Sequence, residues 1–158
     1  MTTIATDGKT IASDSLVTYG HERGAGKVEK IRVHMGRIYA LGGLGCMMPA
    51  LIEWHLAGAD PRNTPPCSSE IGWDLLVIDA GGIVRYSSAA PYAAPVHPPW
   101  AMGQGAEFAL GAIYAGASPA EAVAIACRLS TTSCLPVQVV DIAEALGLGS
   151  APIQMAAE

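Results

Sequence analysis

The chain has 158 residues, of which 51% are hydrophobic and only 15% are charged. This composition excludes an intrinsically disordered protein, which needs high charge and few apolar residues. Nine Lys and Arg against 14 Asp and Glu give a net charge of -5 without a basic cluster, so no nucleic-acid partner is expected. The length corresponds to about one domain of ~150 residues, and we expect a single domain over 1–158 with a marginal tail from 143 to 158.

From the sequence we expect no membrane segment and no export signal. The longest uncharged stretch without dense proline, 38–52, is interrupted by glycines and falls short of the ~20 apolar residues of a membrane span. The start, Met1 to Ala5, has no basic region before Asp7, so we expect no signal peptide. The cysteines form no C-x-x-C pair, and no histidine has metal-ligand spacing to them, which predicts reduced thiols and no zinc site. We therefore expect a cytoplasmic protein without a membrane partner.

The first half of the sequence predicts two β-hairpins followed by a helix. Asp7-Gly8 is a strong hairpin turn between two runs rich in β-branched residues. Pro49 fits a helix only because it falls in the first turn. The expected elements are strands at 2–6 and 10–15, a glycine-rich loop at 20–27, strands at 28–34 and 38–41, and a helix at 47–56.

The second half predicts a third hairpin, two helices and a last strand. Ser118-Pro119-Ala120-Glu121 is a capping box with proline at the first helical position. In the helix that follows, Ala122, Ile125, Ala126 and Leu129 have the spacing of one buried stripe. The other expected elements are a loop at 59–70, strands at 73–79 and 83–88, an irregular proline-rich segment at 89–99, a helix from 103 to about 115, and a strand at 137–142.

Strands in runs and helices in runs favour an α+β fold with stacked antiparallel β-sheets flanked by helices, not a doubly wound sheet.

Removal of Met1 would make Thr2 the N-terminal residue. A terminal Thr carries a hydroxyl nucleophile and an α-amine with an ordinary pKa near ~8, which can act as its base. By itself the Met-Thr start is a weak signal, because many chains begin this way, and it favours an ordinary first residue.

The wider pattern resembles proteasome β-type subunits and the bacterial HslV-type peptidase. Those mature chains begin T-T-x-x and continue with D-x-x-x-T-x-G, G-x-V-x-K and a glycine-rich turn into a helix. The segments that match are Thr2 to Ala5, Asp14 to Gly20, Gly26 to Ile31, Leu41 to Gly45 and Gly103 to Phe108, followed by the capped helix. The resemblance covers about two thirds of the chain and implies the αββα sandwich of the N-terminal nucleophile hydrolases, with a reduced helix layer.

The resemblance assigns catalytic roles to four residues. Thr2 is implied to be nucleophile and base. Lys30 would hold the Thr2 amine neutral through its positive charge, and Asp14 would orient Lys30. Gly42 would donate its backbone N–H to the developing oxyanion, although a simple turn explains this glycine equally well.

The same alignment implies a substrate-binding site and partners. Thr18 would hold the substrate backbone as an added strand. The first specificity pocket would consist of apolar residues, although some of them suit a core equally well: Val17, Val28, Ala40, Leu44 and Met48. No cofactor is required, but backbone carbonyls of Cys127, Ser130 and Ser133 would bind a monovalent cation such as sodium. The implied partners are further copies of the chain in a ring-like homo-oligomer, a peptide or unfolded-protein substrate, and an AAA+ unfoldase.

Two departures from the family pattern keep alternatives open. Gln104 stands where the family has Ser near the Thr amine, and only a short segment separates Leu56 from Trp73, where the family inserts a second helix. An alternative is therefore a catalytically silent subunit of the same fold with an assembly or binding role. A third alternative is an unrelated α+β thiol or metal protein.

Overall fold

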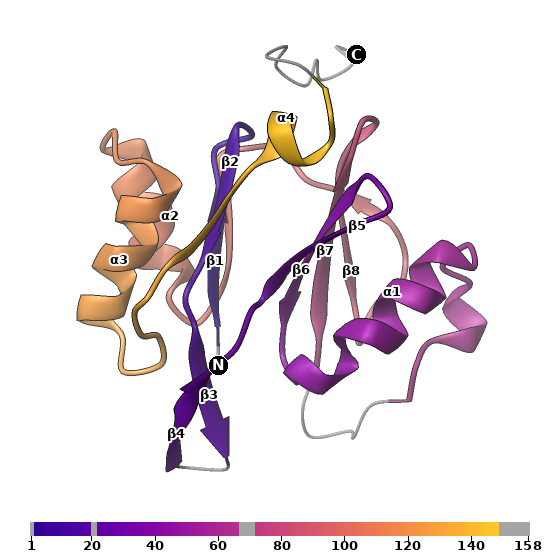
Figure 1. The fold of residues 1–158 in the computed structure, drawn as a ribbon, viewed down its shortest axis with the longest axis horizontal. Helices are drawn as coiled ribbons and strands as arrows, with labels where there is room; N and C mark the ends of the chain where they lie inside the picture. The colour runs from indigo at the N-terminus through magenta and orange to yellow at the C-terminus, as the bar shows by residue number, and fades with distance from the viewer. Residues whose placement is uncertain (1, 20–21, 67–71, 149–158) are drawn as a thin grey trace.

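Two antiparallel β-sheets lie face to face, with helices on their outer faces (Figure 1). The computed structural model describes residues 2–19, 22–66 and 72–148. The strands are β1 (Thr3–Thr6), β2 (Thr10–Ser13), β3 (Leu16–Tyr19), β4 (Glu22–Lys27), β5 (Ile31–His34), β6 (Arg37–Gly42), β7 (Asp74–Asp79), β8 (Gly82–Ser87), β9 (Ala94–Pro95), β10 (Trp100–Gly103) and β11 (Gln138–Asp141). The helices are α1 (Met48–Leu56), α2 (Ala106–Tyr114), α3 (Pro119–Leu129) and α4 (Ile142–Ala145), with short 3-10 turns η1 (Gly45–Met47) and η2 (Pro61–Asn63). This arrangement confirms the α+β fold with stacked antiparallel sheets flanked by helices.

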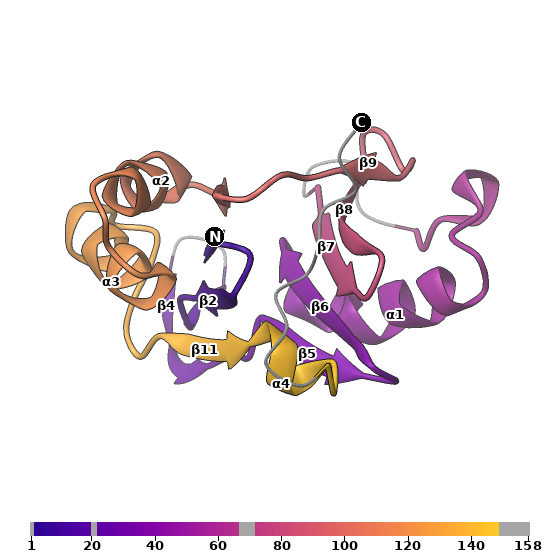
Figure 2. The same cartoon turned by 90° about the horizontal axis from the view of Figure 1, so that it is seen from above.

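The first sheet has the strand order β10-β1-β2-β11, so the strand that follows Thr2 lies in its interior. Helices α2 and α3 cover its outer face (Figures 1 and 2). The layer between helices and sheet is built almost entirely of alanine: Ala5, Ala12, Ala109, Ala122, Ala126 and the larger Val123. Small side chains let the helices approach the sheet closely, because no bulky group keeps the backbones apart.

The second sheet has the order β5-β6-β7-β8-β9, and α1 covers its outer face within the described residues. Beneath α1 lies an aromatic cluster in which Trp54 contacts Trp73 and Tyr86 edge to face. Tyr39 hydrogen-bonds His55 Nδ1 at 3.1 Å in the same cluster. Between the two sheets, apolar side chains from both form the main core: Ile4, Ile11, Ile31, Ile38, Ala40, Leu76, Ile78, Ile83, Val96, Met102 and Ile142.

A third, two-stranded sheet corrects one prediction. The expected loop at 20–27 is largely strand, because β4 pairs with β3 in an antiparallel hairpin. Glycine and alanine have low β-propensity, but this hairpin is held by backbone pairing rather than by side-chain burial, so its sequence carries little strand signal. Residues 20 and 21 lie outside the described part.

Two other differences concern the second half. Strand β10 occupies 100–103, where no strand was expected, and a two-residue strand, β9, lies inside the proline-rich segment 89–99. The expected buried stripe on α3 was wrong for Ile125 and Leu129, which are 37% and 62% exposed. The helix is rotated so that Pro119, Ala122, Val123 and Ala126 face inward, because only small residues fit against the alanine-lined sheet.

Most local signals were confirmed. The hairpin turn at Asp7-Gly8, the start of α1 with Pro49 and the capping box at Ser118 are all present. Parts of the predicted loop at 59–70 and of the tail, 67–70 and 149–158, lie outside the described residues. None of the described helices is both long and apolar enough to cross a membrane.

Candidate active site

A buried ion pair lies at the centre of the predicted site. Asp14 follows the last residue of β2 and is completely buried, and Lys30 precedes β5 with only 5% of its surface exposed. Lys30 Nζ lies 2.8 Å from Asp14 Oδ1. Two charges so far from solvent persist only when they neutralise each other and are hydrogen-bonded as well.

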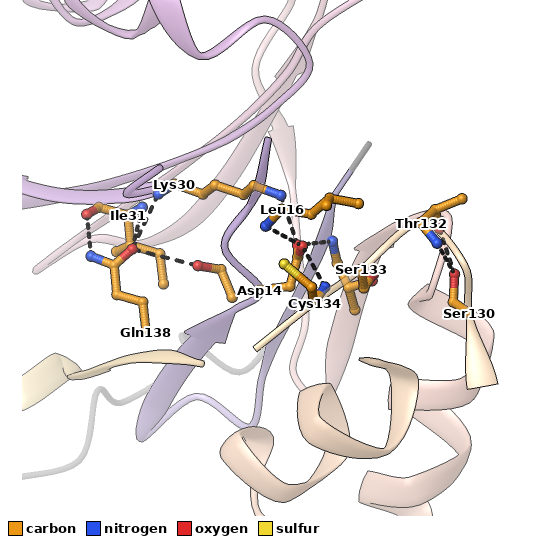
Figure 3. A network of polar contacts seen from close by, with 11 residues as sticks. Asp14, Leu16, Lys30, Ile31, Ser130, Thr132, Ser133, Cys134 and Gln138 are labelled. Carbon is orange, nitrogen blue, oxygen red and sulfur yellow. Dashed lines mark hydrogen bonds and ion pairs between the residues drawn. The ribbon is translucent and has the colours of Figure 1, made fainter. Parts of the chain in front are cut away.

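The Asp14 carboxylate also binds three backbone N–H groups (Figure 3). Oδ1 accepts from Thr3 N at 2.8 Å, and Oδ2 accepts from Leu16 N at 2.9 Å and Cys134 N at 3.3 Å. The carboxylate thus joins the start of β1, the start of β3 and the loop before β11. Because Thr3 directly follows Thr2, Asp14 fixes the first residues of the chain next to Lys30.

Thr2 is 3% exposed and packs against the turn formed by Gly103, Gln104 and Gly105. Gln104 N donates to Thr2 O at 2.9 Å. Gly103 has φ +91°, and a Cβ there would lie 1.9 Å from Thr2 O; a Cβ at Gly105 would lie 2.2 Å from Thr3 Oγ1. Both glycines are therefore required for close contact with the first strand.

The side chain at the position where the family pattern has Ser near the Thr amine is that of Gln104. It is exposed and forms no hydrogen bond with the described residues. Its backbone, not its amide group, contacts Thr2. A different hydroxyl reaches the first strand: Ser133, which is 1% exposed, hydrogen-bonds Thr3 Oγ1 at 2.5 Å.

Gly42 is the last residue of β6 and lies one position beyond the partner of Lys30. Leu41 N donates to Lys30 O at 2.9 Å, so the β6 ladder brings Gly42 to the same end of the sheet as the ion pair. The next residue, Gly43, has φ +122°, and a Cβ there would lie 2.7 Å from Gly72 O. The chain therefore turns sharply after Gly42.

A cavity of about 640 Å³ opens beside Lys30. Its walls include five residues predicted to bind substrate: Val17, Thr18, Val28, Leu44 and Met48. Ala40 does not line it. Ala40 is fully buried and packs in the core between the two sheets, because alternate residues of β6 face opposite sides. Sequence reasoning missed other residues of the wall. They come from the β3–β4 hairpin and the segment after it, from the end of β6 and the turn that follows, and from η1: Leu16, Tyr19, Gly26, Lys27, Glu29, Leu41, Gly43, Gly45 and Cys46.

The three residues predicted to bind a cation lie at and beyond the end of α3. Cys127 is in its last turn, Ser130 caps it, and Ser133 lies in the loop that follows. No backbone N–H of the described residues donates to their carbonyls, which leaves these oxygens available as ligands. Burial, with the negative charge of Asp14, raises the pKa of the Cys127 thiol to about 11, so the thiol is neutral at physiological pH. In the described ranges, no three His, Cys, Asp or Glu side chains gather to hold a metal.

The comparisons with known proteins found matches among solved structures but none among family models or curated sequences. No family model matches the chain, and no curated protein matches it in sequence. A solved structure of Thiobacillus denitrificans BPH has a TM-score of 0.63 at 22% identity, covering 89% of this chain and 97% of that one. HslV from Trypanosoma brucei has a TM-score of 0.64 at 17% identity, covering 89% and 98%. BPH in complex with epoxomicin has a TM-score of 0.62 at 21% identity, again covering 89% and 98%. The chain therefore has the fold of these HslV and BPH structures, with stacked antiparallel sheets flanked by helices.

Proposed function

We propose that this protein is a threonine-type peptidase in which Thr2, exposed as the N-terminus by removal of Met1, is the nucleophile. Met1 lies outside the described residues. One observation carries the proposal: the buried Asp14–Lys30 pair is tied to the backbone of Thr3, directly beside Thr2, and Lys30 also lines the cavity. Burial of two charges is costly, so a buried pair kept beside a cavity supports the assignment of a reaction centre there.

The reaction proceeds in two stages. The Thr2 amine accepts the proton of the Thr2 hydroxyl as Oγ1 attacks the peptide carbonyl. The protonated amine then gives this proton to the leaving amine, which leaves an acyl ester on Thr2. In the second stage the amine accepts a proton from water, the resulting hydroxide attacks the ester, and the released Thr2 oxygen takes the proton back.

The surrounding residues have supporting roles in this proposal. The positive charge of Lys30 disfavours protonation of the amine, and Asp14 holds Lys30 in place. The backbone N–H of Gly42 stabilises the oxyanion, and Thr18 pairs with the backbone of the substrate. The chemistry needs no cofactor; a monovalent cation such as sodium would bind the carbonyls of Cys127, Ser130 and Ser133 and rigidify that loop.

Self-association in a ring-like chamber is part of the proposal. The substrate would be a peptide or an unfolded protein, and an AAA+ unfoldase would be the partner that delivers folded proteins. The structural likeness to HslV supports this. The alternative, a silent subunit, is disfavoured because the Asp14–Lys30 pair is intact.

An epoxyketone peptide should add once to the processed protein. This warhead bonds to both the hydroxyl and the amine of a terminal Thr. A single adduct therefore shows that both groups are present and reactive. Intact-mass measurement should show loss of Met1 and the mass of one inhibitor. Retention of Met1 in the active preparation, or loss of Met1 without any adduct, would contradict the proposal.

The variant Gln104→Ser distinguishes the enzyme from the silent subunit. Because the Gln104 side chain is exposed and only its backbone contacts Thr2, the variant should keep the fold. An adduct in Gln104→Ser but not in the unmodified sequence would identify Gln104 as the residue that silences the site.

We expect cleavage after apolar residues. The cavity wall presents the apolar side chains of Val17, Val28, Leu44 and Met48, and burial of a leucine-sized side chain is worth about 1.5–3 kcal/mol. Fluorogenic peptides that differ only in the residue before the scissile bond should show kcat/KM at least about tenfold higher for Leu than for Lys. Equal rates, or a preference for Lys, would contradict this assignment of the cavity.

A further inference from the structure

We propose that Gln138 is a positioning residue that holds Lys30 in place by clamping the two sheets together. This inference rests on the proposed function for its catalytic consequence. Gln138 is the first residue of β11, at the edge of the four-stranded sheet, whereas Lys30 and Ile31 begin the edge of the five-stranded sheet. No sequence motif indicated this residue.

The Gln138 side chain takes the place of a neighbouring strand. Its Oε1 accepts from Lys30 N and from Ile31 N, each at 3.1 Å, and its Nε2 donates to Ile31 O at 2.7 Å (Figure 3). Lys30 pairs with Leu41, so Ile31 directs its N–H and C=O away from β6 in the antiparallel ladder. Those groups would otherwise be unpaired at a sheet edge, and the side-chain amide satisfies both of them.

The same amide is also linked to β2, the strand that ends just before Asp14. Gln138 lies opposite Ser13 in the register of β2 and β11, and Ser13 Oγ donates to Gln138 Oε1 at 3.5 Å. One side chain thus contacts the backbone of Lys30 and the residue before Asp14. The two partners of the ion pair belong to different sheets, and Gln138 fixes their separation.

Lys30 depends on this clamp because of its place in the chain. Its ammonium group must reach Asp14 Oδ1 at 2.8 Å from a backbone held on one side by Leu41 N and on the other by Gln138 Oε1. Loss of the second contact frees the first residues of β5 to move away from β11. A displacement of about 1 Å in a catalytic group can reduce the rate about 100-fold.

The test compares Gln138→Met with a control on the same strand. Methionine has nearly the length of glutamine but cannot accept two N–H groups or donate to a carbonyl. The control, Val139→Thr, changes a side chain that is 49% exposed and contributes nothing to the clamp. If Gln138→Met does not fold, Gln138→Asn is used as the test variant in its place. Its side chain keeps the amide group but is one methylene too short to form the same contacts with Lys30 and Ile31.

Amide hydrogen exchange followed by NMR tests the clamp without any reference to activity. In Gln138→Met, the N–H groups of Lys30 and Ile31 should exchange at least about tenfold faster than in the unmodified protein. The buried, ion-paired ammonium of Lys30 should give a slowly exchanging signal in the unmodified protein and should lose it in Gln138→Met. Val139→Thr should leave both signals unchanged. Unchanged exchange at Lys30 and Ile31 in Gln138→Met overturns the proposal, whether or not the protein is active.

Peptide hydrolysis tests the positioning role. We expect kcat of Gln138→Met to fall by about tenfold to 100-fold while KM stays within about twofold, because Val17, Val28, Leu44 and Met48, the apolar residues proposed to bind the substrate, are unchanged. Faster exchange with unchanged kcat would reduce Gln138 to a structural clamp and overturn its positioning role. If the unmodified protein itself forms no epoxyketone adduct, the proposed function fails, and the ammonium signal of Lys30 still decides whether Gln138 positions this residue.

Discussion

Replacement of Thr2 by alanine should abolish peptide hydrolysis, with a fall in kcat of at least about 10³-fold, because the proposed nucleophilic hydroxyl is removed. The fold should remain, since Thr2→Ala keeps the carbonyl that accepts from Gln104 N and leaves the register of β1 unaltered. The measurement is the hydrolysis of a fluorogenic peptide, with intact mass to show that Met1 has been removed from both proteins.

The matched variant is Thr2→Ser, which keeps a hydroxyl and an α-amine on the same residue. It should retain measurable activity and should still form the epoxyketone adduct, whereas Thr2→Ala should form none. Equal hydrolysis by Thr2→Ala and the unmodified protein would contradict the nucleophile assignment, and unfolding of Thr2→Ala would be detected by its circular dichroism.

Replacement of Asp14 by alanine should lower the free energy of unfolding by about 3–5 kcal/mol, because the buried ammonium of Lys30 would lose the carboxylate that neutralises its charge. Three backbone N–H groups, from Thr3, Leu16 and Cys134, would lose their acceptor as well. Urea unfolding followed by circular dichroism measures the loss.

Lys30→Met should destabilise the protein less than Asp14→Ala, since the three N–H groups continue to stabilise the carboxylate. Both variants should lose peptidase activity. The control is Arg37→Gln, which breaks the exposed ion pair with Asp79 and should alter the free energy of unfolding by less than about 1 kcal/mol. An effect of Asp14→Ala as small as that of Arg37→Gln would show that the buried pair does not hold the first strand.

The parts of the fold that could be predicted from the sequence are those encoded over a few residues. The turn at Asp7-Gly8, the proline in the first turn of α1 and the capping box at Ser118 each depend on neighbours within a helical turn or a hairpin. Strand β10 could not be found in this way, because its partner β1 lies far away in the chain and proline precedes it.

The candidate site also contains residues that could be identified from the sequence and residues that could not. The resemblance identified Asp14 and Lys30, and the structure brings them within 2.8 Å. The contacts of Ser133 and Gln138 were missed because they join positions more than 100 residues apart, and neither side chain belongs to a local motif. Ala40 was misplaced because the strand alternation that turns it toward the core depends on where β6 begins.

The layer of alanine residues beneath α2 and α3 lies on one side of the site, and the β3–β4 hairpin lies on the other. The two sides should differ in how well they tolerate amino-acid substitutions. Gly105 lies between Thr3 and Ala126 of α3, and the space there is too small for even a Cβ atom on Gly105. A larger side chain at Ala126 would therefore press on Gly105. The hairpin of β3 and β4, in contrast, contributes to the cavity wall mostly through exposed or half-buried residues. Diversification of substrate preference, by evolution or by library selection, should therefore accumulate in this hairpin, while the helix layer stays restricted to small residues.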